Sequence, residues 1–271
     1  MKLVVKIGGA LLDQPEVVEQ CAVCVAGLAA QGNKVAVVHG GGGELTRLLK
    51  RVGKQSQFVG GLRVTDAETR DFALMVLAGS VNKRLVAALG MVGQPAFGLC
   101  GGDGLTFRAK KLSNGADLGF VGEVVSVNAP ALEAIWELRV PPFQNQSGWG
   151  TPVPVIASIA LGLDGEYYNV NADQMAAACA SALGADRLVF LTDVSGVWDA
   201  QKNVIAQLDG DGISRLRKDG VISGGMLPKL EACEKALEGG VNSVHILPGA
   251  DPEALQQLRS GQIRMGTELV S

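Results

Sequence analysis

Hydrophobic residues along this chain form short β-branched runs that alternate with longer stretches of helical periodicity. The runs predict strands at residues 3–7, 34–38, 95–99, 153–159, 187–192 and 243–247. Apolar positions three or four residues apart predict helices at residues 16–30, 43–52, 66–77, 81–89, 130–138, 172–183, 226–238 and 252–259. The strands are almost continuously apolar, which is typical of a sheet buried on both faces. The pattern therefore predicts a layered α/β fold.

Residues 105–127 interrupt this alternation. Asn114 and Gly115 lie between two extended runs there, and an Asn-Gly pair in that position predicts a β-hairpin. We expect this hairpin to form an antiparallel flap on the first half of the chain. The Pro-, Gly- and Gln-rich stretch at residues 140–154 predicts a loop.

The composition is that of a globular protein with an aliphatic core. Of the 271 residues, 47% are hydrophobic and 19% are charged, and the net charge is −3 without any long block of one sign. This argues against a nucleic-acid partner. The longest apolar runs have about ten residues, whereas a membrane-spanning helix needs about 20. With no signal-peptide pattern, we expect a cytoplasmic protein with no membrane partner.

The cysteines and histidines offer little chemistry. Cys21 and Cys24 form a C-x-x-C pair, but they fall on the apolar stripe of a predicted helix, so we expect them to be buried. The five cysteines are scattered, which argues against a disulfide framework. We expect His39 and His245 to be structural residues in or beside strands.

Glycine is the most unusual feature of the composition. The chain has 37 glycines, about twice the average usage of about 7%. They cluster at predicted junctions of strands and helices, at residues 8–9, 40–43, 101–104 and 224–225. Bare glycine N–H groups at such junctions bind anions. Because Lys6 and Lys229 accompany two of these clusters, we expect a site for phosphates or carboxylates at one edge of the sheet.

Common nucleotide and hydrolase motifs do not occur. The chain has no P-loop, no dinucleotide-binding G-x-G-x-x-G after a strand, and no H-R-D or D-F-G pair. It also has no G-x-S-x-G, which argues against a serine hydrolase.

Six segments in order carry a family likeness. They are KIGG at residues 6–9, VVHGGGGEL at 37–45, GGLRVTD at 60–66, YNVNADQMA at 168–176, LTDVSGV at 191–197 and GGMLPKLEA at 224–232. Together they resemble the amino acid kinase family over nearly the whole chain. The resemblance implies a three-layer αβα sandwich with a mostly parallel central sheet and two lobes. Residues 1–184 would bind the amino-acid substrate and form a dimer, and residues 185–271 would bind ATP.

Within the family, the segments most resemble the members that act on N-acetyl-L-glutamate. The resemblance implies ATP-dependent phosphorylation of its side-chain carboxylate, the second step of arginine biosynthesis. It also implies Mg²⁺ bound through the nucleotide phosphates, without protein ligands. Two alternatives are a carrier-protein-linked aminoadipate or glutamate kinase of lysine biosynthesis and a catalytically silent sensor on the same fold.

The resemblance assigns the catalytic roles to three charged residues. Lys6 would lie against the transferring phosphoryl group and Lys229 on the leaving side. Asp173 would lie between both ammonium groups. A helix N-cap is the alternative role for Asp173, and Asn171 competes for it.

The resemblance also assigns binding residues. The substrate would be bound by Gly41, Gly42, Arg63 and Asn169, with Arg63 on its α-carboxylate. ATP would be bound by Gly8, Gly9, Asp193, Val194, Ser195, Gly196, Val197, Trp198, Val221, Ile222 and Ser223. The N–H groups of Gly8, Gly9, Gly41 and Gly42 would donate to the phosphoryl oxygens and the reacting carboxylate.

The resemblance also has implications for the oligomeric state and for inhibition by arginine. Arginine-inhibited members carry a helix before the first strand, and this chain begins close to Lys6. We therefore expect a homodimer without arginine feedback. The interface would lie on the apolar helices predicted between residues 66 and 89.

Overall fold

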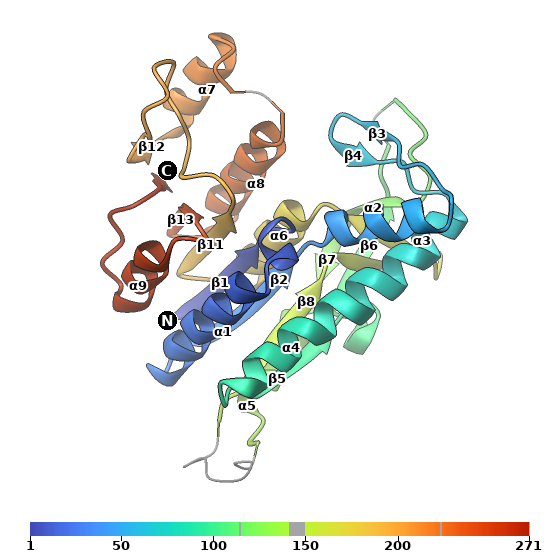
Figure 1. Ribbon diagram of the computed structural model, residues 1–271, viewed down its shortest axis with the longest axis horizontal. Helices are drawn as coiled ribbons and strands as arrows, with labels where there is room; N and C mark the ends of the chain where they lie inside the picture. Colours follow the sequence, from blue (N-terminus) through green and yellow to red (C-terminus); the bar gives the residue numbers. More distant parts are fainter. Residues whose placement is uncertain (114, 141–149, 223, 271) are drawn as a thin grey trace.

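The computed structural model describes residues 1–113, 115–140, 150–222 and 224–270. Its centre is an eight-stranded sheet in the order β12-β14-β13-β11-β1-β2-β8-β5 (Figure 1). Its strands are β1 (Lys2–Ile7), β2 (Lys34–His39), β5 (Ala96–Leu99), β8 (Val153–Ala157), β11 (Arg187–Thr192), β12 (Gln207–Leu208), β13 (Ser243–Pro248) and β14 (Thr267–Leu269). Neighbouring strands are parallel except β13 and β14.

Side chains along the sheet alternate between two hydrophobic cores. In β1, Leu3, Val5 and Ile7 enter the first core, whereas Val4 enters the second. The first core is covered by α1 (Pro15–Ala30), α2 (Gly42–Arg51), α4 (Asn82–Met91) and α9 (Pro252–Ser260). The second is covered by α5 (Ala129–Glu137), α6 (Ala172–Leu183), α7 (Gly210–Lys218) and α8 (Met226–Glu238). The predicted three-layer sandwich with a mostly parallel sheet is confirmed.

Most predicted elements are observed with ends within one residue of those expected. In the main sheet and the helices that cover it, α7 and the short strands β12 and β14 were not predicted. The five cysteines are buried and free, which confirms the predicted burial of Cys21 and Cys24. Of the predicted loop at 140–154, residues 141–149 lie outside the described residues.

The expected flap is part of a barrel. The strands β6 (Phe107–Lys111) and β7 (Val121–Val127) pair antiparallel, as the hairpin prediction requires, although Asn114 lies outside the described residues. They close into a barrel with β9 (Ile159–Gly162) and β10 (Tyr167–Val170). The prediction of one strand at 153–159 was wrong, because the chain leaves the main sheet at Ser158 and continues in the barrel.

One continuous helix replaces the two helices predicted at 66–77 and 81–89. It consists of α3 (Ala67–Ala73), a π-helical segment (Leu74–Val81) and α4. The wider π-helical turns carry the chain through Gly79 and Ser80, which lie between the two predicted helices. By length and composition this helix, Ala67–Met91, would suffice to cross a membrane, and 39% of its most apolar 18-residue window is buried. It packs on α1 and on the edge of the sheet.

The carboxyl ends of the parallel strands bring three loops together. Gly8 and Gly9 follow β1, Gly40 and Gly41 follow β2 and lead into Gly42 and Gly43 in the first turn of α2, and residues 193–196 follow β11. Strand β1 lies between β2 and β11, so these loops are immediate neighbours. A small hairpin of β3 (Phe58–Val59) and β4 (Leu62–Arg63) lies near the second loop (Figure 1).

Candidate active site

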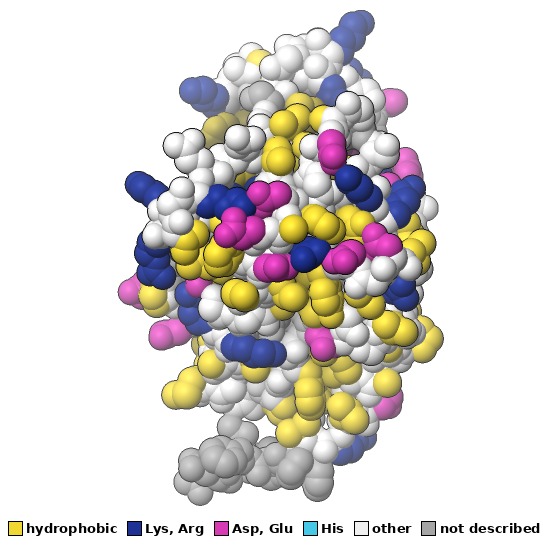
Figure 2. All heavy atoms as spheres, turned by 90° about the vertical axis from the view of Figure 1, so that its right-hand side faces the viewer, with side chains coloured by type: hydrophobic (Ala, Val, Ile, Leu, Met, Phe, Trp, Pro, Cys, Tyr) yellow, Lys and Arg dark blue, Asp and Glu magenta, His cyan; other side chains and the backbone are white. Residues whose placement is uncertain are grey.

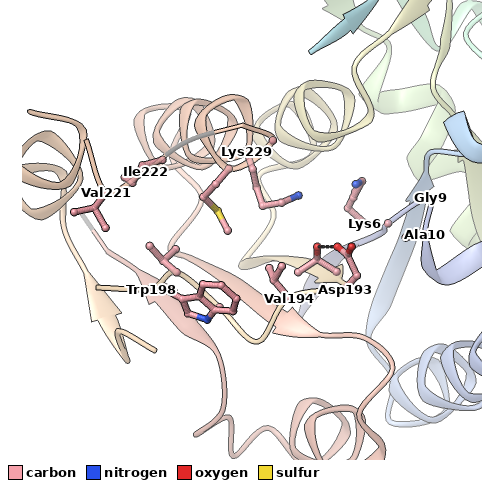
Figure 3. A pocket seen from close by; sticks show the side chains of 15 residues that line it. Lys6, Gly9, Ala10, Asp193, Val194, Trp198, Val221, Ile222 and Lys229 are labelled. Atoms are coloured by element: carbon pink, nitrogen blue, oxygen red, sulfur yellow. Dashed lines mark hydrogen bonds between the residues drawn. The ribbon is translucent and has the colours of Figure 1, made fainter. Parts of the chain in front are cut away.

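Two lysines share one carboxylate in the interior of the protein. Lys6 Nζ lies 2.7 Å from Asp173 Oδ1, and Lys229 Nζ lies 2.9 Å from Asp173 Oδ2. All three residues are at most 8% exposed. The structure therefore brings together residues from β1, α6 and α8 that are far apart in the sequence. In Figure 3 the labelled Lys6 and Lys229 point their nitrogen atoms toward the same region.

The alternation of side chains along β1 explains why Lys6 reaches this place. Lys6 is two residues from Val4, so both side chains face the layer of α6 and α8. Asp173 lies in the first turn of α6, where Asn171 is the N-cap and its Oδ1 accepts from the N–H groups of Asp173 and Gln174. Because Asn171 caps the helix, the carboxylate of Asp173 is free to bind the lysines.

Burial and charge set the protonation of this cluster. Burial alone raises the pKa of Asp173, but the ammonium groups of Lys6 and Lys229 outweigh it and bring that pKa down to about 2. Burial lowers the pKa of Lys6, while the contact with Asp173 opposes this effect. Asp173 is therefore ionised at neutral pH and holds two cations in a region of low solvent access.

A cavity of about 460 Å³ opens beside the two lysines. Of the predicted ATP-binding residues, it is lined by Gly8, Gly9, Asp193, Val194, Gly196, Val197, Trp198, Val221 and Ile222. Ser195 does not line it, but its Oγ accepts from the indole N–H of Trp198 at 3.0 Å. Ser223 lies outside the described residues. The lining also includes Ala10, Thr192, Gly225 and Met226, which the sequence analysis missed.

A smaller cavity of about 170 Å³ contains all four predicted substrate-binding residues, Gly41, Gly42, Arg63 and Asn169. Arg63 Nη2 donates to Gly42 O at 3.0 Å and to Thr46 Oγ1 at 2.7 Å, and Nη1 donates to Ser56. The guanidinium also lies over the ring of Phe58, 4.6 Å from its centroid. Of its five N–H donors, two are left for a ligand.

The smaller cavity has further walls that sequence reasoning did not find. Phe58, Leu62, Leu77 and Ser158 contribute to it. Leu62 and Phe58 flank the predicted Arg63 in the β3–β4 hairpin, and that neighbourhood was the available signal. Leu77 and Ser158 carry no signal, since only the packing of the π-helical segment and the turn into the barrel directs them there.

The first two glycine loops approach each other closely. A Cβ atom on Gly9 would lie 3.2 Å from the backbone nitrogen of Gly41. A Cβ atom on Gly41 would lie 2.8 Å from the Leu77 side chain, and Gly41 has a φ of +149°. Gly8 differs from the expectation, because its N–H already donates to Leu191 O at 2.8 Å and is not available to a phosphate. Gly8 instead allows close packing of β1 on β11, since a Cβ atom there would lie 3.0 Å from Leu191 O.

The cluster at Gly101 to Gly104 does not join the site. Within the described part of the chain, these glycines line neither cavity. A Cβ on Gly101 would lie 2.6 Å from Ala160 Cα, and one on Gly102 would lie 2.2 Å from the Tyr167 hydroxyl. These glycines therefore allow the loop after β5 to pack against the barrel.

We compared the chain with a library of protein families and with known proteins. The profile of the amino acid kinase family matches residues 1–248. A protein of Acidobacterium capsulatum named acetylglutamate kinase is 57% identical over all of this chain and all of its own. A protein of Koribacter versatilis with the same name is 53% identical over 100% of this chain and 99% of its own.

Solved structures agree with this assignment. N-acetylglutamate synthase from Neisseria gonorrhoeae, complexed with coenzyme A and N-acetyl-glutamate, has a TM-score of 0.84 at 25% identity. The similarity covers 100% of this chain and 59% of that longer one. Carbamate kinase from Giardia lamblia bound to AMP-PNP covers 100% of this chain and 98% of its own, with a TM-score of 0.67 at 15% identity, and shares the fold.

Asp173→Asn tests the dependence of the fold on the shared carboxylate. The change leaves two buried ammonium groups without their anion, so we expect the free energy of unfolding in urea to fall by about 3–5 kcal/mol. Adding Lys229→Met should recover part of this loss, because one of the two repelling cations is removed. Asp13→Asn breaks an exposed pair with Arg47 and should cost less than about 1 kcal/mol. An Asp173→Asn protein as stable as the parent would contradict this account.

Proposed function

The chain belongs to the amino acid kinase family, and on that premise we propose that it transfers the γ-phosphoryl group of ATP to the side-chain carboxylate of N-acetyl-L-glutamate. It is an ATP-dependent carboxylate kinase with acetylglutamate kinase activity. The product, N-acetyl-L-glutamyl 5-phosphate, is the second intermediate of arginine biosynthesis. The observation that carries the proposal is the buried pair of lysines on Asp173, which line the larger cavity, while the smaller cavity includes Asn171 and Ala172 just before Asp173.

The charges of the reactants explain the need for two lysines. A carboxylate that attacks a phosphoryl group brings two anions together, and at about 4 Å their repulsion is roughly 4 kcal/mol at an effective dielectric constant of 20. Lys6 neutralises charge on the transferring phosphoryl group, and Lys229 does so on the leaving side. Their burial beside the larger cavity supports these roles. Phosphoryl transfer depends on such positioning and charge neutralisation more than on covalent help.

Asp173 is a positioning residue in this scheme. It holds both ammonium groups in place before ATP binds, so they need not reorganise during the reaction. The attacking carboxylate is already ionised at pH 7, so no general base is required. Gly9, Gly41 and Gly42 direct backbone N–H groups at the reacting atoms. Their close packing at the edge of the sheet supports this role.

The two cavities take the two substrates. Arg63 binds the α-carboxylate through its remaining donors, and Asn169 binds the acetylamino portion. The nucleotide is held by residues that line the larger cavity, namely Asp193, Val194, Gly196, Val197, Trp198, Val221 and Ile222. Ser195 contributes through its hydrogen bond with Trp198. Residues 1–184 supply the acid-binding part and residues 185–271 most of the nucleotide-binding part.

Mg²⁺ would bind through the phosphate oxygens of ATP and water, and it would supply further charge neutralisation. The described residues contain no group of three or more His, Cys, Asp or Glu side chains able to hold a metal ion, so we assign it no protein ligand. We further propose a cytoplasmic homodimer that acts on small molecules and has no nucleic-acid or membrane partner.

The apolar helix Ala67–Met91 supports the homodimer. Only 39% of its most apolar window is buried, and Met75 and Met91 are 63% and 86% exposed. Figure 2 shows one face of the molecule, on which hydrophobic side chains spread among charged ones. A second copy of the chain would bury this uncovered apolar surface.

A hydroxylamine trap tests the reaction. Hydroxylamine converts an acyl phosphate to a hydroxamate, so we expect ATP-dependent formation of a hydroxamate from N-acetyl-L-glutamate and little from glutamate, aspartate or aminoadipate.

Lys229→Ala tests the role of this lysine in the same assay. The substitution should lower kcat by about 10²- to 10³-fold, the usual cost of losing one group that stabilises transition-state charge. Lys235→Ala, an exposed lysine of the same helix, is the control and should keep the parental rate.

Other outcomes of the trap would point to the alternatives. Product from aminoadipate or glutamate only when linked to a carrier protein would favour a lysine-biosynthesis kinase. No ATP consumption with any acid would favour the silent sensor.

Arg63→Lys tests the acid-binding role of the guanidinium. A lysine has one ammonium nitrogen in place of the three nitrogens of the guanidinium, so it cannot hold Gly42 O, Thr46 and a carboxylate from separate nitrogens. We therefore expect the KM for N-acetyl-L-glutamate to rise at least about tenfold, which corresponds to about 1.4 kcal/mol of lost binding. The KM for ATP should stay within a factor of about two. Arg47→Lys, at an exposed arginine, is the control. An unchanged KM for the acid would remove Arg63 from the site.

Light scattering tests the homodimer. We expect a mass twice that of the 28.0 kDa chain. Met75→Glu places a charge on the exposed side of the helix and should shift the protein toward the monomer. Val23→Glu, on the exposed side of α1, should not. A parent protein that runs as a monomer or a hexamer would refute the proposal.

A further inference from the structure

A buried histidine and a buried asparagine lie behind the glycine loop that follows β2, and the scheme above does not use them. His39 ends β2, and Asn82 begins α4 directly after the π-helical segment. Both side chains are completely buried. Asn82 Nδ2 lies 3.0 Å from His39 Nε2 and 2.8 Å from Val155 O, and His39 Nδ1 lies 2.7 Å from Gly40 O.

The partners determine where the hydrogens are. The carbonyl of Gly40 can only accept, so Nδ1 of His39 must carry the proton and donate it. Nε2 then has a free lone pair, which accepts one hydrogen of the Asn82 amide, while the other goes to Val155 O. The result is a chain of three hydrogen bonds that runs from the neighbouring strand β8, through the long helix, to the glycine loop.

This arrangement requires a neutral imidazole. Burial lowers the pKa of His39 to about 4, and the charges of Lys6 and Arg84 act in the same direction. A protonated ring would direct a second N–H at the amide of Asn82, which has only donors to offer there. Near pH 7 the ring is neutral, so the chain of hydrogen bonds keeps one fixed direction.

The glycine loop is held at several points along its length. His39 holds the carbonyl of Gly40, and Arg63 Nη2 holds the carbonyl of Gly42 at 3.0 Å. Between them, Gly41 packs against Leu77 and Val81 of the π-helical segment. The N–H groups of Gly41 and Gly42 therefore have little freedom to move relative to Lys6.

We propose that His39 and Asn82 are positioning residues for phosphoryl transfer, which set the place of the Gly41 and Gly42 N–H groups through the carbonyl of Gly40. This inference rests on the proposed function. The physical reason is that a misplacement of about 1 Å in groups that touch the reacting atoms can cost about 10²-fold in rate. The alternative is that the pair only stabilises the fold.

The first experiment replaces Asn82 by a residue of similar size without hydrogen bonds. In the hydroxamate assay, Asn82→Leu should lower kcat with N-acetyl-L-glutamate by about 10- to 100-fold. The KM for ATP should stay within about twofold, because the nucleotide cavity does not include this loop. Asn33→Ala is the matched control. Asn33 is also buried and its amide donates to Leu28 O at 2.9 Å, far from both cavities.

A pair of substitutions at His39 separates positioning from packing. The Nδ2 of asparagine lies the same number of bonds from Cα as Nδ1 of histidine, so His39→Asn keeps a donor for Gly40 O. Glutamine instead places its nitrogen at the level of Nε2 and loses that bond. We expect His39→Asn to recover most of the kcat that His39→Gln loses, while both variants melt at similar temperatures.

The outcomes are distinct. If Asn82→Leu and His39→Gln melt earlier, like Asn33→Ala, but keep the parental kcat and KM, the pair is structural and the inference is overturned. The same holds if His39→Asn and His39→Gln lose equal activity. If the parent protein forms no hydroxamate from any acid, the proposed function itself fails.

Discussion

Two ammonium groups can occupy one buried region of this protein because a carboxylate lies between them. Lys6 and Lys229 come from opposite parts of the chain and both contact Asp173, within 2.9 Å. Without the anion, burial and mutual repulsion would disfavour both charges. The ion cluster thus joins β1, α6 and α8, and it prepares the cationic surface that two anionic reactants need.

Strand β1 is central to this arrangement. It pairs with β2 and β11, so its carboxyl end lies beside the glycine loop of one and the Asp193 loop of the other. One face of β1 carries aliphatic residues into the first core, while Lys6 occupies the other face at the end of the strand. The larger cavity is therefore lined by residues at the ends of β1 and β11, and the smaller one by residues at the end of β2.

The glycines serve two different purposes. Gly9 and Gly41 let two loops approach each other closely at the ends of β1 and β2. Gly101 and Gly102 serve the packing of the barrel instead. The π-helical segment of the long helix Ala67–Met91 packs against Gly41, while much of the apolar surface of this helix is uncovered.

The sequence by itself determined the layered fold and most element boundaries, and through the family resemblance it named the three charged residues and the glycines at 8–9 and 41–42 that the structure brings together, but not the exclusion of Gly101 to Gly104. These features follow from local periodicity and from short motifs, which a chain carries without reference to its distant parts. Only the tertiary structure decided that Asn171 caps α6, so that the carboxylate of Asp173 binds the lysines. It also decided that the Gly8 N–H donates to Leu191 O. The positions of Leu77, Thr192 and Met226 in the cavity walls were decided there as well. The division of residues 153–162 between sheet and barrel and the continuous helix through Gly79 were also decided there. Each depends on strand order, on the direction of side chains and on hydrogen-bond partners far away in the chain, and no local pattern contains that information.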